Sequence, residues 1–382
     1  MLYNRGMEQK QRERFMREAL RQAVKGAGAV APNPQVGAVI VKNGLIVGKG
    51  YHKRFGGPHA EVEAIRNCRK KGNDPSETTM FVTLEPCCHQ GKTPPCTEAI
   101  KEAGITCVEI ATLDECELVA GKGAVWLRKQ GIDIQVGCCA KEARQLNGGF
   151  FKLQKTSQPQ VILKWAQSID GKLAWPVQAK KRWITNEKAR KHVHELRSRC
   201  GAVLVGIGTA LADDPLLTVR LGKRTWQPRR VVLDSKLRIS PESNLVQTAP
   251  KAPLVIYSLQ SSIDQQQPKV DALTERDCSI RAVPYKNGQL DLSAVLKDLG
   301  RLGVTDLLVE GGAAILKSFW EEHLADKIMV YITPAIIGNA HNVPAIHFAN
   351  RFNVLKDTQI TKFDDDFLIE AHLADKANQA SL

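Results

Sequence analysis

The sequence TLEPCCHQGKTPPC at residues 83–96 and the triplet HAE at residues 59–61 carry the clearest chemical signal in this chain. The triplet supplies an imidazole and a carboxylate, and the longer segment supplies thiols at Cys87 and Cys96. One imidazole and two thiolates suit Zn²⁺, which binds nitrogen and sulfur ligands in a tetrahedron. Three protein ligands leave a fourth position for water, and such an open position is typical of catalytic zinc sites.

The spacing of His59 and Glu61 limits where such a site can lie. Residues two apart do not share a helix face, so both can reach one metal-bound water only at the start of a helix. We therefore expect a helix over residues 59–70, with the site at its first turn. A carboxylate that does not bind the metal is suited to move protons between the water and a leaving group.

The third zinc ligand is not fixed by spacing alone. Cys88 and His89 are further metal-binding groups in the same loop. We favour Cys96, because adjacent Cys87 and Cys88 fit a tetrahedral site poorly. The pattern is that of zinc-dependent nucleobase deaminases, except that eight residues rather than two separate Cys87 from Cys96. The alternatives are a structural zinc site or a group of thiols without metal.

Hydrophobic patterning predicts two successive α/β domains, at residues 1–150 and 151–382. Asn-Gly at residues 43–44, between two apolar runs, predicts a β-hairpin. In the first half we expect helices at 8–25, 59–70, 97–103, 123–129 and 140–146, and strands at 36–41, 45–48, 79–84, 106–111 and 132–136. In the second half we expect strands at 161–166, 202–206, 230–234, 253–257, 305–309, 327–332 and 367–372, and helices at 186–199, 291–300 and 313–322. Residues 147–149 should stop the preceding helix, 156–159 should form a linker, and 259–269 should form a surface loop.

The composition bounds the range of partners. The chain has 382 residues, with 54 Lys and Arg against 40 Asp and Glu, which gives a net charge of +14. This balance favours anionic small molecules, because no long basic block with interleaved aromatic residues indicates nucleic-acid binding. No apolar run of about 18 residues and no signal-peptide pattern is present, so we expect no membrane span and a cytoplasmic location. Eight of the ten cysteines lie in the first 150 residues, which indicates metal binding or catalysis in that half.

The second half carries weaker signals of its own. GIGT at residues 206–209 and EGGA at 310–313 each follow an apolar strand, as phosphate-binding turns do. Arg197 and Arg220 are candidates for phosphate recognition. The alternatives are tight turns between strand and helix, and arginines that are merely solvated.

The chain resembles the bacterial bifunctional riboflavin-biosynthesis deaminase–reductases. In the first half the matching segments are HAE at 59–61, TLEPC at 83–87, GKTPPC at 91–96, NPQVGA at 33–38 and GYH at 50–52. In the second half they are LKWAQSIDGK at 163–172, WIT at 183–185, VGIGT at 205–209, LADDPLLTVR at 211–220, VLDS at 232–235 and VEGG at 309–312. The long insertion between the two cysteines is the usual form in this family.

The resemblance implies a cytidine-deaminase-like three-layer domain followed by a dihydrofolate-reductase-like domain. It implies zinc binding by His59, Cys87 and Cys96, a proton-shuttle role for Glu61, and a pyrimidine pocket shaped by Asn33 and His52. It implies NADPH contacts at Ala166, Trp183, Thr209, Asp213, Ser235 and Gly312. It implies contacts to the phosphoribosyl-pyrimidine at Arg197, Leu217, Arg220 and Glu310. One segment departs from the family pattern, because Lys181 stands where the family usually has a substrate-binding serine.

The implied reactions are two consecutive steps on one chain. The first is zinc-dependent deamination of 2,5-diamino-6-(5-phosphoribosylamino)pyrimidin-4-one, and the second is NADPH-dependent reduction of its ribosyl group to ribityl. The implied partner is this small molecule, without nucleic acid or membrane, and the chain is expected to form a homo-oligomer. One alternative is a nucleobase or RNA deaminase with a basic binding domain. Another is a non-catalytic zinc scaffold, which would have no use for Glu61.

Overall fold

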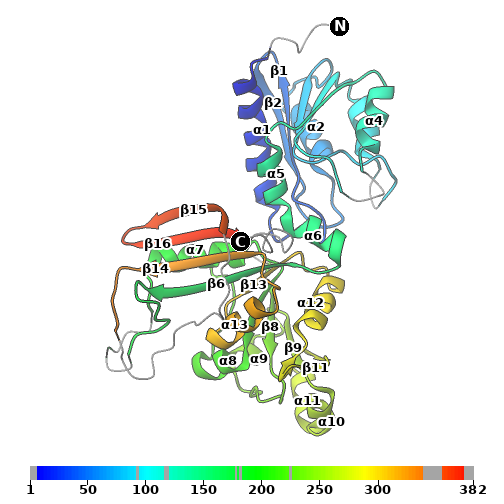
Figure 1. The fold of residues 1–382 in the computed structure, drawn as a ribbon. Coiled ribbons are helices and arrows are strands. Elements are labelled where there is room, and N and C mark those ends of the chain that lie inside the picture. The colour runs from blue at the N-terminus through cyan, green and yellow to red at the C-terminus, as the bar shows by residue number, and fades with distance from the viewer. Residues whose placement is uncertain are drawn as a thin grey trace. The chain divides into compact units, whose positions relative to one another are not determined.

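A computed structural model describes residues 7–91, 94–115, 120–176, 179, 183–222, 226–338 and 355–373. The chain divides into two compact units, Met1–Thr156 and Ser157–Leu382 (Figure 1). Among the described residues, each cluster of buried apolar side chains belongs to one unit. No helix in the described part of the chain combines the length and the apolar character that crossing a bilayer requires.

The first unit is built on a five-stranded sheet with the order β2-β1-β3-β4-β5. Its strands are β1 (Gly37–Lys42), β2 (Leu45–Tyr51), β3 (Thr79–Val82), β4 (Cys107–Ile110) and β5 (Asp133–Val136). β3, β4 and β5 run parallel, and β1 is antiparallel to β2 and β3. Asn43 and Gly44 both have positive φ, at 52° and 74°, as the tight turn of the expected hairpin requires.

Helices cover both faces of this sheet and give three layers (Figure 1). α1 (Gln9–Ala23) and α5 (Ala140–Leu146) pack on one face, and α2 (Ala60–Lys70), α3 (Cys96–Glu102) and α4 (Lys122–Lys129) pack on the other. The residues of β1 alternate between the two cores. Ala38 and Ile40 belong to the cluster beneath α2, whereas Val39 and Val41 belong to the cluster beneath α1.

The second unit contains a nine-stranded sheet with the order β10-β9-β8-β7-β13-β6-β14-β16-β15. Its strands are β6 (Gln160–Ser168), β7 (Ala202–Gly206), β8 (Arg229–Leu233), β9 (Leu254–Ser258), β10 (Cys278–Ala282), β13 (Asp306–Val309), β14 (Lys327–Thr333), β15 (Leu355–Phe363) and β16 (Asp366–Leu373). The first seven strands in this order are mutually parallel. β16 pairs with β14 in the antiparallel direction, and β15 pairs with β16 in the same way. A separate small hairpin joins β11 (Tyr285–Lys286) and β12 (Gln289–Leu290).

Both faces of this second sheet are also covered, which explains why its central strands are continuous apolar runs. Helices α12 (Leu292–Arg301) and α13 (Ala313–Glu321) contribute to one core. Helices α7 (Glu187–Arg197), α8 (Ile207–Asp213), α9 (Asn244–Gln247) and α11 (Gln267–Thr274) contribute to the other. Asn186 caps α7 through its side chain, and Asp291 caps α12 in the same way.

The expected elements are present within a few residues, with two corrections. Residues 259–269 are not a loop, because α10 (Gln260–Asp264) and the start of α11 occupy them. The helix expected at 140–146 does end before Asn147, but a further helix, α6 (Gly148–Thr156), begins at once. α6 buries Phe150 and Phe151, and this burial outweighs the low helix propensity of its two glycines.

Candidate active sites

His59, Cys87 and Cys96 lie together at the ends of three different segments. His59 is the N-cap of α2, as its spacing from Glu61 requires, and Cys96 is the first residue of α3. Cys87 lies in the loop between β3 and α3. One ligand atom from each of the three residues lies within 4.8 Å of the others. Nδ1 of His59 is 3.2 Å from Sγ of Cys96 and 3.5 Å from Sγ of Cys87.

The two thiols differ in acidity. Hydrogen bonds from Cys96 and His59 lower the pKa of Cys87 to about 4, and one of them comes from the backbone N–H of Cys96 at 3.4 Å. The hydrogen bond with Cys87 and burial together raise the pKa of Cys96 well above the usual range. These groups amount to one thiolate, one thiol and one imidazole. A bound divalent cation would favour deprotonation of the Cys96 thiol and so give two thiolates and one imidazole as ligands. The donors therefore fit zinc.

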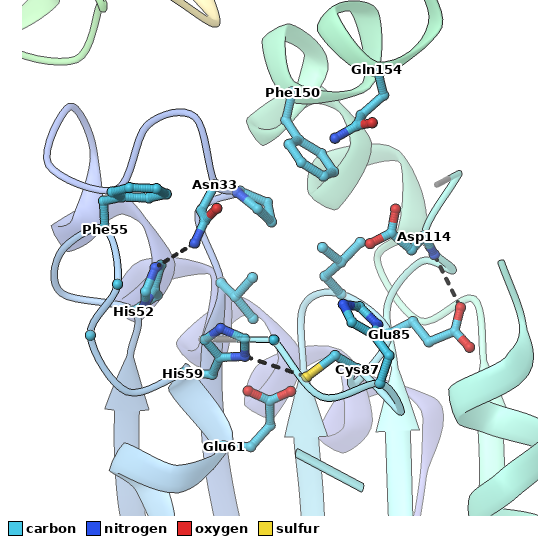
Figure 2. Close-up of a pocket in the computed structure, with 17 residues that line it drawn as sticks. Asn33, His52, Phe55, His59, Glu61, Glu85, Cys87, Asp114, Phe150 and Gln154 are labelled. Atoms are coloured by element: carbon cyan, nitrogen blue, oxygen red, sulfur yellow. Dashed lines mark hydrogen bonds between the residues drawn. The ribbon is translucent and has the colours of Figure 1, made fainter. Parts of the chain in front are cut away.

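Glu61 occupies the first turn of α2, and its side chain points toward His59 and Cys87 (Figure 2). The residue is 3% exposed, and burial raises the pKa of its carboxyl group to about 7. Among the described residues, Oε2 of Glu61 has no hydrogen-bond partner. A buried polar atom without a partner indicates a water or ligand at that position. The carboxylate of Glu61 faces His59 and Cys87, so a water bound to a metal ion at these ligands would fit beside it.

A pocket of about 320 Å³ is lined by His59, Glu61 and Cys87, whereas Cys96 is buried beneath it. Asn33 and His52, the residues expected to shape a pyrimidine site, both line it (Figure 2). Nδ1 of His52 is 3.0 Å from the carbonyl oxygen of Pro58, which can only accept, so Nδ1 carries the proton. Nε2 of His52 then accepts from the amide of Asn33 at 3.2 Å. Burial lowers the pKa of His52 and favours this neutral form.

The pocket has further lining residues that were not predicted as site residues. They include Phe55, Glu85, His89, Asp114, Phe150 and Gln154. Phe150 and Gln154 come from α6, so missing this helix also concealed one wall of the pocket (Figure 2). Glu85 belongs to the quoted TLEPC segment, and its carboxylate accepts backbone N–H groups of Asp114, Gly121 and Ala124 at 3.2, 2.8 and 3.0 Å. Glu85 thereby joins Asp114 and the start of α4 to the pocket.

Four of the six predicted cofactor residues of the second unit lie at one edge of its sheet. Thr209, Ser235 and Gly312 follow the carboxyl ends of β7, β8 and β13, and Ala166 lies near the carboxyl end of β6. The four strands are parallel and adjacent in the order β8-β7-β13-β6. Ligands of open α/β sheets bind at this type of edge.

Thr209 and Gly312 are in direct contact, because the N–H of Gly312 donates to Oγ1 of Thr209 at 3.2 Å. Gly312 is the N-cap of α13 and supplies no side-chain cap, so N–H groups of the first turn remain available to an anion. A Cβ atom on Gly311 would lie 2.8 Å from Cβ of Ile315, so glycine permits the close approach of α13. These features fit the pyrophosphate of a dinucleotide.

Arg197 and Glu310 form a partly buried bidentate ion pair. Nε and Nη2 of Arg197 lie 2.6 and 3.0 Å from the two carboxylate oxygens of Glu310. Nζ of Lys164, which was not predicted as a site residue, lies 3.7 Å from Oε2 of Glu310. Burial alone would raise the pKa of Glu310, but the two cations lower it to about 2. Burial lowers the pKa of Lys164.

The remaining predicted residues have other surroundings. Leu217 is buried and Arg220 is exposed, and the N–H of Arg220 lies 3.4 Å from Nδ1 of His194. Asp213 is the exposed last residue of α8. Trp183 is 54% exposed, and its carbonyl accepts from the indole of Trp175. Lys181 lies outside the described residues.

Two family models match consecutive parts of this chain. Residues 9–112 match the cytidine and deoxycytidylate deaminase zinc-binding region, and residues 159–369 match the RibD C-terminal domain. Their order confirms the expected fold class, a cytidine-deaminase-like domain followed by a reductase domain.

Similar proteins cover most of the chain. The riboflavin biosynthesis protein RibD of Aquifex aeolicus is 42% identical over 329 residues, which is 86% of this chain and 88% of that protein. The corresponding protein of Escherichia coli is 38% identical over 341 residues, which is 86% and 89% of the two chains. A crystal structure of a diaminohydroxyphosphoribosylaminopyrimidine deaminase/5-amino-6-(5-phosphoribosylamino)uracil reductase from Thermotoga maritima has a TM-score of 0.82 and 34% identity, and covers 96% of this chain and 99% of its own. The RibD structure of Acinetobacter baumannii has a TM-score of 0.81 and 31% identity, with 96% and 100% covered.

Proposed function

Because this chain belongs to the RibD family of bifunctional riboflavin-biosynthesis enzymes, we propose an assignment of its two activities to named residues. The enzyme deaminates 2,5-diamino-6-(5-phosphoribosylamino)pyrimidin-4-one with the aid of zinc, and it then reduces the ribosyl group with NADPH. We assign the deaminase to residues 1–156 and the reductase to residues 157–382. The boundary expected between residues 150 and 151 falls inside α6, whose Gln154 lines the deaminase pocket.

In the deaminase, His59, Cys87 and Cys96 hold the zinc ion. When bound, zinc supplies the Lewis acidity that makes water nucleophilic near neutral pH. Glu61 takes a proton from the attacking water at Oε2 and delivers it to the departing amino group. A carboxyl group buried beside the reacting water can hold this proton between the two transfers. Asn33 and His52 orient the pyrimidine ring at the side of the pocket.

In the reductase, Thr209 and Gly312 hold the cofactor phosphates at the start of α13. Ala166, Trp183, Asp213 and Ser235 complete the cofactor contacts. When bound, NADPH supplies the hydride, and the acceptor is C1 of the ribose.

The substrate contacts of the reductase divide into two kinds. The guanidinium of Arg197 is already engaged by Glu310, so this arginine orients the carboxylate that meets the substrate. Arg220 is exposed and is the better placed cation for the substrate phosphate. Leu217 and Lys181 supply the further substrate contacts.

One observation carries the deaminase assignment. Oε2 of Glu61 is buried beside His59, Cys87 and Cys96, and it has no hydrogen-bond partner among the described residues. The test incubates zinc-loaded protein with the diaminopyrimidine substrate, with and without NADPH, and identifies the products by mass. We expect loss of ammonia in both samples and reduction only with NADPH. Absence of reaction in both samples would favour the alternative of a nucleobase or RNA deaminase.

We infer further that the enzyme works in the cytoplasm on small molecules, without nucleic acid, and forms a homo-oligomer. The nine described cysteines are all free thiols, which suits a reducing compartment. β15 is an exposed strand at the end of the nine-stranded sheet, and such an edge is a natural site for pairing between chains. Cell fractionation, gel shift with RNA at moderate salt, and light scattering test the three statements.

A further inference from the structure

Residues 214–220 of the reductase unit are held by side chains rather than by regular secondary structure. The segment connects α8 to the residues before β8 and contains no helix or strand. Leu217 and Arg220 both belong to it. At its start, Asn244 donates to the carbonyl oxygen of Asp214 at 3.1 Å and to the carboxylate of the same residue at 2.8 Å.

Leu217 has an unfavourable backbone conformation that needs external support. Its φ is 52°, in the left-handed region that leucine rarely adopts, and the residue is 4% exposed. Such a conformation persists only where the surroundings fix it. The carbonyl groups on both sides of Leu217 are bound by arginines. Nη1 of Arg230 donates to the oxygen of Leu216 at 3.2 Å, and Nη1 of Arg197 donates to that of Thr218 at 3.4 Å.

Arg230 is a cation that is completely shielded from solvent. It is 0% exposed, and no carboxylate of the described residues forms an ion pair with it. Besides Leu216, its guanidinium donates to Oγ1 of Thr248 at 2.7 Å and to the carbonyl of Ala252. Burial lowers the pKa of Arg230 to about 10, which reflects the unfavourable removal of a cation from water. The bonds of this buried charge join residue 216 to the segment that follows α9.

Gln227 binds both backbone polar groups of Val219, near the other end of the segment. Its Oε1 accepts the N–H of Val219 at 2.7 Å, and its Nε2 donates to the carbonyl of Val219 at 3.1 Å. Val219 directly precedes Arg220. Gln227 lies just before β8 and Arg230 lies within it, so one region of the chain fixes both ends of residues 216–219.

We propose, resting on the substrate contacts assigned above, that Gln227 and Arg230 are positioning residues of the reductase. They hold residues 216–219 so that Leu217 and Arg220 meet the phosphoribosyl part of the substrate. Neither side chain has to touch the substrate. Loss of this hold weakens binding of the substrate and of its transition state alike, so KM rises while kcat is retained.

The test uses the full-length, zinc-loaded enzyme with the deaminated intermediate as the reductase substrate. Gln227→Met removes both hydrogen bonds at nearly constant volume. We expect the KM for this substrate to rise at least tenfold, with kcat and the KM for NADPH within twofold of the wild type. Deamination by the same chain should not change. A substrate KM within twofold of the wild type would overturn the proposal.

A structural role alone would give a different result. It would lower the melting temperature and the active fraction, and therefore the apparent kcat, without moving KM. Gln289→Met is the matched control, because Gln289 also uses both ends of its amide, toward Glu322 and Ser318. This control should leave the substrate KM unchanged.

Arg230→Lys keeps the charge and a donor, so its KM should lie between that of the wild type and that of Arg230→Met. If Arg230→Met does not fold, the Gln227 variant still tests the proposal.

Arg220→Met separates failure of this proposal from failure of the assigned substrate site. An unchanged KM in Arg220→Met would show that the contact itself is wrong. A raised KM in Arg220→Met but not in Gln227→Met would overturn the positioning role alone. If Gln227 acts through Arg220, the double variant should have a KM within twofold of that of Arg220→Met. If the factors by which Gln227→Met and Arg220→Met raise KM instead multiply in the double variant, Gln227 does not act through Arg220.

Discussion

Glu61 is the residue whose chemistry depends most directly on its surroundings. Burial brings its pKa to about 7, and its position at the first turn of α2 directs its side chain toward His59 and Cys87. Glu61→Gln removes the titratable proton and keeps the shape of the side chain. We expect deamination to fall about 10²- to 10⁴-fold, the usual contribution of a positioned acid–base group. Steady-state ammonia release measures this rate.

Zinc content and reductase activity should be unchanged in this variant, because Glu61 is not one of the three ligands. Glu63→Gln is the matched control on the same helix, where Glu63 pairs with Lys53 and does not line the pocket. That control should deaminate at the wild-type rate. Retained deamination in Glu61→Gln would remove Glu61 from the mechanism.

Glu310 makes the stability of the reductase unit depend on pH. Arg197 and Lys164 outweigh the effect of burial and lower its pKa to about 2, from a usual value of 4.5. A carboxyl group with a lowered pKa stabilises the fold above its unfolded pKa and loses that contribution as the pH falls toward the folded value. The two values correspond to about 3 kcal/mol at pH 7, of which about 1 kcal/mol is lost by pH 4. Glu310→Gln should remove this part of the pH dependence.

Urea unfolding of the reductase unit at pH 7, 5 and 4 measures the effect. The difference in unfolding free energy between wild type and Glu310→Gln should shrink as the pH falls. Glu242→Gln, at a surface carboxylate paired with Arg276, serves as the control and should alter stability little at any pH. A difference that stays constant from pH 7 to pH 4 would contradict the role of the ion pair.

The predictability of individual site residues depended on whether they belong to a local pattern. His59 and Glu61 are close in the sequence, and their spacing alone predicted a helix start, as found. Lys164 lies 146 residues from Glu310, and only the pairing of β6 with β13 brings the two strands together. Glu85 was visible in its motif, but its three backbone partners come from residues 114–124. Such contacts follow from the fold and not from local sequence.

Elements with an apolar pattern were predicted well, and those without one were missed. β7 is buried along its entire length, and its apolar run was recognised. α10 buries none of its residues and is supported by local bonds such as Gln260 to Asp264, so its polar composition indicated a loop. β15 is exposed at every position except its last, so no alternation marked it. In these segments hydrogen bonding to neighbours replaces burial as the source of order.

The packing of α1 on β1 depends on a glycine. A Cβ atom on Gly37 would lie 2.0 Å from the carbonyl oxygen of Ala19 and 2.6 Å from the amide nitrogen of Ala23. Gly37→Ala would therefore force the helix away from the sheet and loosen the core around Phe15 and Val39. We expect the unfolding free energy to fall by about 1–3 kcal/mol, as in other overpacked cores. Urea denaturation of the deaminase unit measures it.

Gly91→Ala is the matched control in the same unit, because no atom lies within 4 Å of a Cβ built there. It should change the unfolding free energy by no more than about 0.5 kcal/mol. Equal effects of the two substitutions would mean that backbone entropy, and not the contact between α1 and β1, decides the outcome.

The chain contains two units with their own hydrophobic cores and their own cofactor chemistry. The clusters around Ile40 and Phe15 lie within the first unit, and those around Leu204 and Val203 lie within the second. The proposed zinc ligands lie in the first unit, and the proposed NADPH contacts lie in the second. Each cofactor should therefore stabilise only the unit that binds it.

Removal of zinc with a chelator tests this separation. The chelated enzyme should lose deamination and keep NADPH-dependent reduction of the deaminated intermediate. Because a ligand that binds only the folded state adds RT ln(1 + [L]/Kd), zinc at 1,000 times its Kd stabilises the first unit by about 4 kcal/mol. Calorimetry should show two transitions, with zinc removal lowering one midpoint and NADPH raising only the other. Zinc added back in excess of the chelator should restore the first midpoint together with deamination. A single transition that shifts with both cofactors would mean that the units unfold as one, because a ligand then stabilises every residue of the cooperative unit.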